Sequence, residues 1–77
     1  MKKLQILGAG CAKCDKLAAN AAQAADELGL EYEIVKVQDI NEIMTFGVML
    51  TPALAVDGEV KVTGKTPDPD ALKPLLR

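Results

Sequence analysis

An alanine-rich amphipathic segment, set between two short apolar runs, constrains the fold of this chain more than any other feature of its sequence. Residues 12–28 place apolar side chains at helical spacing along one narrow stripe and polar side chains opposite. The stripe consists of Cys14, Leu17, Ala18, Ala21, Ala25 and Leu28. The flanking runs at 3–7 and 31–37 have the length and composition of buried strands. This order predicts a parallel β-α-β unit with a right-handed crossover.

A short second helix is expected after these two strands. Asp39 and Glu42 have the spacing of an N-cap and a capping box, and Gly47 can end the helix. Its apolar side chains are Ile40, Ile43 and Met44.

Two antiparallel strands are predicted at 53–56 and 59–63, because Asp57-Gly58 is a strong signal for a two-residue hairpin turn. The first run is wholly apolar, as a central strand would be, and the second alternates, as an edge strand would.

A final helix is expected to start at Asp68-Pro69, as N-cap and first helical residue. Pro74 should keep this helix short or kink it. The complete order is then β-α-β-α-β-β-α. It predicts one α/β domain over residues 1–77, with a four-stranded mixed sheet flanked by helices.

Composition excludes several classes of function. Nine Lys+Arg against eleven Asp+Glu give a net charge of −2, and Tyr32 and Phe46 are the only aromatic residues. This is not the composition of a nucleic-acid-binding surface. The chain has no histidine, which removes Ser-His or Cys-His catalysis and histidine metal ligands. No apolar run is long enough to span a membrane, and the N-terminal run is too short for a signal peptide, so a cytoplasmic protein is expected.

The two cysteines stand in the motif Cys11-Ala12-Lys13-Cys14, at the start of the predicted first helix. A disulfide across four residues is a poor structural staple, so a chemical role is favoured. Cys14 lies on the buried stripe, whereas Cys11 should be exposed. That asymmetry suits thiol–disulfide exchange, with Cys11 as nucleophile and Cys14 as resolving thiol. The helix N-terminus should stabilise a thiolate, and Lys13 either adds to this effect or only solubilises the helix.

These residues, together with Thr51-Pro52 ahead of the hairpin, resemble the thioredoxin superfamily, and especially its small thioredoxin/glutaredoxin-like members (the redox-active disulfide protein 2 family). The resemblance covers essentially the whole chain and implies a minimal thioredoxin fold. It also implies that Pro52 is cis beside the sulfurs, and that the backbone of Thr51 pairs with the substrate. The loop around Gly64 is implied to border the substrate groove.

The chain also departs from the family pattern. Gly10 stands where thioredoxins usually have an aromatic residue, and Ala12-Lys13 replaces their common proline. The first strand offers only Leu4, Gln5 and Ile6 where a buried acid often lies beneath the second cysteine. The sequence therefore does not identify the proton acceptor for Cys14. Asp15 is adjacent in sequence but lies on another side of the predicted helix, and water is the alternative.

The resemblance implies a protein-disulfide reductase that needs no cofactor beyond its own Cys11–Cys14 disulfide. Its partners would be client protein disulfides and a donor of the thioredoxin-reductase type, or glutathione, and the chain is expected to be a monomer. A Cu(I)-binding metallochaperone-like domain is an alternative, because two thiolates suit Cu(I). A redox-sensing interaction module without turnover is another. Neither a nucleic acid nor a membrane is expected as a partner.

Overall fold

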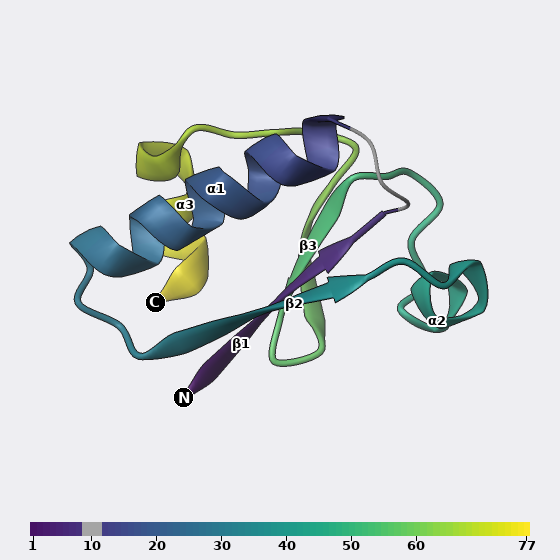
Figure 1. Ribbon diagram of the computed structural model, residues 1–77, viewed down its shortest axis with the longest axis horizontal. Helices are drawn as coiled ribbons and strands as arrows, with labels where there is room; N and C mark the ends of the chain where they lie inside the picture. Colours follow the sequence, from purple (N-terminus) through teal and green to yellow (C-terminus); the bar gives the residue numbers. More distant parts are fainter. Residues whose placement is uncertain (9–11) are drawn as a thin grey trace.

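The computed structural model describes residues 1–8 and 12–77 of the chain. Its elements follow the predicted order β-α-β-α-β-β-α, which is confirmed (Figure 1). They are β1 (Lys2–Leu7), α1 (Ala12–Glu27), β2 (Tyr32–Val37), α2 (Ile40–Thr45), β3 (Ala53–Val56), β4 (Glu59–Thr63) and α3 (Pro69–Leu76). No helix within these residues is long and apolar enough to cross a membrane.

The four strands form one mixed sheet in the order β2-β1-β3-β4. Strands β1 and β2 are parallel, with Lys2 opposite Tyr32 and Leu7 opposite Val37. Strand β3 runs antiparallel to β1, and β4 antiparallel to β3. Helix α1 makes the crossover between the two parallel strands. The carboxyl ends of β1 and β2 therefore lie at the same edge of the sheet as the start of α1.

Helices α1 and α3 pack against each other and against one face of the sheet, as Figure 1 shows. Helix α2 covers only one end of the other face. There its single buried residue, Ile43, packs with Leu7 at the end of β1, Val37 at the end of β2 and Ala53 at the start of β3. Of the apolar side chains expected on this short helix, Ile40 and Met44 remain exposed.

The buried stripe of α1 agrees with the sequence except at its C-terminal end. Ala24 is also fully buried, whereas Leu28 lies just beyond the helix and is only partly buried. The helix stops where Gly29 takes a φ of 69° and donates to the carbonyl of Asp26 at 3.1 Å. Leu30 donates to the carbonyl of Ala25 at 3.0 Å. This pair of bonds is a Schellman motif, and it explains why the helix ends at Glu27.

The hairpin between β3 and β4 turns at Asp57-Gly58, where φ is 51° and 87°. Two positive φ values in a two-residue turn define the type I′ turn that the sequence predicts. The turn is also tied to β1. The amide of Lys3 donates to the Asp57 carboxylate at 2.8 Å, and the Gln5 side-chain oxygen accepts from the amide of Gly58 at 2.7 Å. These bonds hold β3 beside β1 and thereby position the residues that precede β3.

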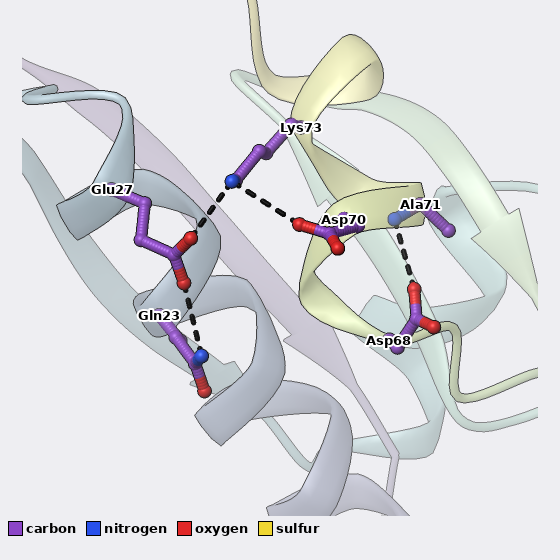
Figure 2. A network of polar contacts seen from close by, with 6 residues as sticks. All are labelled: Gln23, Glu27, Asp68, Asp70, Ala71 and Lys73. Carbon is purple, nitrogen blue, oxygen red and sulfur yellow. Dashed lines mark hydrogen bonds and ion pairs between the residues drawn. The ribbon is translucent and has the colours of Figure 1, made fainter.

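A polar network joins the C-terminal end of α1 to α3 (Figure 2). Lys73 lies 2.8 Å from the Glu27 carboxylate and 3.2 Å from that of Asp70, and Gln23 donates to Glu27 at 2.9 Å. The hydrogen bonds from Lys73 and then Gln23, with the charge of Lys73, lower the pKa of Glu27 below its ordinary value of 4.5. The bonds to Glu27 and Asp70 raise the pKa of Lys73. Asp68 caps α3 by accepting from the amide of Ala71 at 3.0 Å.

This network predicts a small pH dependence of stability. Because the pKa of Glu27 is lower in the folded state, its carboxylate stabilises the fold above pH 4.5. That contribution is lost as the pH falls through the lowered, folded-state pKa. Glu27→Gln should therefore flatten the fall in unfolding free energy between about pH 5 and about pH 2, measured by urea titration. Glu31→Gln removes the same charge outside the network and serves as the control. If both variants lose stability with acid as steeply as the unmodified chain, the network is not the cause.

Candidate active site

Cys14 is the third residue of α1 and is buried, with 6% of its surface exposed. It belongs to the main core cluster, together with Leu17 of the same helix and Leu54 of the central strand β3. The prediction that Cys14 faces inward is confirmed. Cys11, its partner in the motif, lies outside the described residues, so the exposure of Cys11 stays a prediction.

Gly8 brings the end of β1 against the sulfur of Cys14. A Cβ atom added at Gly8 would collide with the Cys14 Sγ and would lie 3.7 Å from the Cβ of Thr51. The amide of Gly8 donates to the carbonyl of Val37 at 3.0 Å, which fixes this segment beside β2. Three parts of the chain thus meet at one point: the end of β1, the first turn of α1 and the residue before Pro52.

This role of Gly8 is not predicted from the sequence, where Gly8-Ala9-Gly10 indicates only a flexible turn after the first strand. A glycine at the end of a strand often marks the close approach of another group to the backbone. The position of Gly8, directly after the first apolar run and three residues before Cys11, is the sequence feature that indicates such a close approach.

The Thr51–Pro52 peptide bond is cis, the isomer that the resemblance implies. Pro52 is fully buried, and Thr51 is exposed. The backbone of Thr51 makes no hydrogen bond to any other described residue. Within residues 1–8 and 12–77, its amide and carbonyl therefore have no backbone partner, and pairing of Thr51 with a substrate stays a prediction.

Gly64 lies beside this loop, after the end of β4. Its amide donates to the carbonyl of Pro52 at 2.8 Å. A Cβ added at Gly64 would stand 3.1 Å from the Cβ of Leu50, so the Leu50 side chain rests on this glycine. The loop around Gly64 and the loop of Pro52 thus form one continuous border next to the site.

Charged side chains near Cys14 are on the surface. Asp15 pairs with Lys36 of β2 at 3.5 Å, with both side chains more than half exposed, and Lys13 is exposed on the first turn of α1. Among the described residues no polar or charged side chain is buried. That part of the chain therefore supplies no buried acid beneath Cys14, which agrees with the departure noted in the first strand.

The Cu(I) alternative would use the thiolates of Cys11 and Cys14, and it stays a prediction because Cys11 lies outside the described residues. Within residues 1–8 and 12–77, no three His, Cys, Asp or Glu side chains gather as ligands. The element order also differs from the β-α-β-β-α-β order of small copper-binding domains, because this chain ends in a helix after a hairpin.

Comparison with known proteins agrees with this geometry. A family model described as a thioredoxin domain matches residues 2–77. The chain belongs to the thioredoxin family. It is 41% identical to a thioredoxin of Methanothermobacter thermautotrophicus over 76 residues, which cover 99% of each chain. It is 40% identical to a thioredoxin of Methanocaldococcus jannaschii over 77 residues, which cover all of this chain and 88% of that protein. The sheet and its three helices are a minimal thioredoxin fold, and membership supports a role of the thiol–disulfide oxidoreductase type.

Proposed function

We propose that this protein reduces disulfides in client proteins, with Cys11 as the nucleophile and Cys14 as the resolving thiol. One observation carries the proposal. The Cys14 sulfur is held inside the first turn of α1, against Gly8 and close to Thr51. A sulfur in this position is shielded from clients and can act only on a group brought to the tip of the helix.

The reaction has two steps. The Cys11 thiolate attacks one sulfur of a client disulfide, forming a mixed disulfide, and the other client sulfur leaves as a thiolate that takes up a proton. Cys14 then loses its proton and attacks the Cys11 sulfur. The second client thiolate leaves, and a Cys11–Cys14 disulfide forms. The client gains two electrons, which a dithiol donor later restores to this protein.

The surroundings suit each step. The N-terminal end of α1 carries positive partial charge, which favours a thiolate in the motif, and Lys13 would add to it. The backbone of Thr51, which makes no hydrogen bond to another described residue, would pair with the client segment that carries the disulfide. With no buried acid among the described residues, we assign the proton of Cys14 to water.

Cys11→Ser tests the proposal. It removes the nucleophile, so reduction of insulin should fall to the uncatalysed rate, because the buried Cys14 cannot replace it. The assay is run with a thioredoxin reductase and, separately, with glutathione as donor, which identifies the donor as well. Oxidation of the unmodified protein should lower its mass by two hydrogen atoms. Insulin reduction that persists in Cys11→Ser would refute the assignment.

The redox-sensing alternative predicts a different pattern in the same assay. A sensor would form the disulfide and lose the two hydrogen atoms, but it would show no repeated turnover of insulin or of any other client.

A further inference from the structure

Large apolar side chains are exposed in one part of the chain. Among the described residues five such side chains are exposed, and four of them lie in α2 or between α2 and Pro52. They are Ile40 at 63%, Met44 at 65%, Met49 at 95% and Leu50 at 63%, and the fifth is Met1. We call the surface of residues 39–50 the docking segment. The exposed apolar side chains of this segment do not contribute to the core, since only Ile43 and Val48 of residues 39–50 are buried.

The docking segment adjoins the redox site in two places, at its C-terminal end and at Ile43. Its C-terminal end runs directly into Thr51, whose Cβ lies close to the position of Cys14. Its helix packs through Ile43 on Leu7, the residue before Gly8. Ile40 and Met44 are four residues apart and therefore lie on the same side of α2. A polypeptide that pairs with the backbone of Thr51 can continue onto this surface.

The charges of the docking segment have one sign. No lysine or arginine occurs anywhere from residue 37 to residue 60, whereas Asp39, the N-cap of α2, and Glu42, within α2, are both exposed. Neither carboxylate forms an ion pair with another described residue. Asp39 accepts a bond from the amide of Asn41 at 2.8 Å, and no other described residue donates a hydrogen bond to the Glu42 carboxylate. Their negative charge is not neutralised within that part of the protein.

We propose that the docking segment selects client segments that carry large apolar and basic side chains beside the oxidised cysteine. The proposal rests on the proposed function and deepens it. Apolar client side chains would cover Met49, Leu50 and the Ile40–Met44 side of α2, which removes apolar surface from water. A lysine or arginine of the client would meet the carboxylates of Asp39 and Glu42. Complementary charge speeds encounter more than it slows dissociation, so selection should show in kcat/KM.

A set of three disulfide peptides tests the selection. Each carries one cysteine in a mixed disulfide with a chromogenic thiol, and its neighbours are apolar and basic, apolar and acidic, or polar and basic. The apolar and basic peptide should have the highest kcat/KM. Its lead over the acidic peptide should be about twofold to fivefold, the range for an exposed ion pair, and should shrink at 1 M salt.

Glu42→Lys locates the charge effect. It should make kcat/KM higher for the apolar and acidic peptide than for the apolar and basic peptide. The rate with a small aromatic disulfide should stay unchanged. Glu31→Lys is the matched control, because it makes the same change of net charge just before β2, at the opposite end of that strand from α2. If both variants shift the peptide order equally, net charge is the cause and the proposal is wrong.

Met44→Gln tests the apolar part with little change in side-chain size. It should lower kcat/KM for both apolar peptides about threefold or more, since the client would then cover a polar group in place of an exposed methionine, and it should spare the polar peptide. If Met44→Gln leaves the ratio of kcat/KM for the apolar peptides to kcat/KM for the polar peptide unchanged, the proposal is overturned. Sedimentation showing a dimer that Met44→Gln dissociates would also overturn it, because a second copy would then cover this surface. If no peptide is reduced even by the unmodified protein, the proposed function itself fails, and not only the selection.

Discussion

Replacing Cys14 with serine should stop the reaction halfway and leave the protein covalently joined to its client. The first step needs only Cys11, so attack on the client disulfide continues. The second step needs a thiol that can reach the Cys11 sulfur from the core side, and serine cannot form a disulfide. Turnover of a client should fall to background, and mass spectrometry should find one mixed disulfide per protein molecule.

The fold must survive for this result to have meaning. Cys14 is buried, and a serine hydroxyl there costs about 1–3 kcal/mol if it finds no hydrogen bond. Cys14→Ala avoids the buried hydroxyl and should trap the same adduct. Cys11→Ser, which lacks the nucleophile, should trap none. The opposite pattern, with adducts on Cys11→Ser and none on the two Cys14 variants, would reverse the roles assigned to the two sulfurs.

Added glutathione separates two ways of completing the reaction. If glutathione attacks the mixed disulfide, turnover of both Cys14 variants returns in proportion to its concentration. If only Cys14 can resolve the adduct, glutathione leaves it in place. The motif alone does not distinguish these cases, because its two middle residues, Ala12 and Lys13, match neither the proline of many thioredoxins nor the tyrosine of many glutaredoxins.

Much of the fold could be predicted because its signals are local. Gly29 ends α1 through bonds to residues within one turn, and Asp57-Gly58 takes the two positive φ values that few other pairs tolerate. The inward position of Cys14 follows from helical spacing along one stripe. None of these features depends on where distant parts of the chain lie, so sequence pattern is sufficient for them.

The remaining features depend on tertiary packing. Ile40 and Met44 look like core residues by pattern, but α2 contacts the sheet only at one end and buries Ile43 alone. The contact between Gly8 and Cys14 joins the end of a strand to the first turn of a helix. The hydrophobic periodicity of either element alone does not predict how the two meet. The pairing of Asp15 with Lys36 likewise needs the register of α1 above β2. Each required the position of one element relative to another.

Gly8→Ala should disrupt the candidate site more than the addition of a methyl group at any other described glycine. The new Cβ would occupy the space of the Cys14 sulfur, and both groups are held by secondary structure, at the end of β1 and inside α1. Relief requires the first turn of α1 to shift. Overpacking of this kind costs about 1–3 kcal/mol of unfolding free energy, and a shift of the helix tip would also displace the motif. Client reduction should therefore fall together with stability.

A double-mutant cycle isolates the contact between the methyl group and the sulfur. In the Cys14→Ala background the sulfur is absent, and the next nearest atoms of the described residues lie 3.7 Å from the new Cβ, which is ordinary van der Waals contact. Any cost of the backbone conformation of Gly8 is present in both backgrounds and cancels. Urea unfolding of the four proteins should then give a coupling energy of about 1 kcal/mol or more between the two sites. Additive effects would mean that the backbone of β1 and the sulfur of Cys14 are not in the close contact on which the proposed placement of the resolving thiol depends.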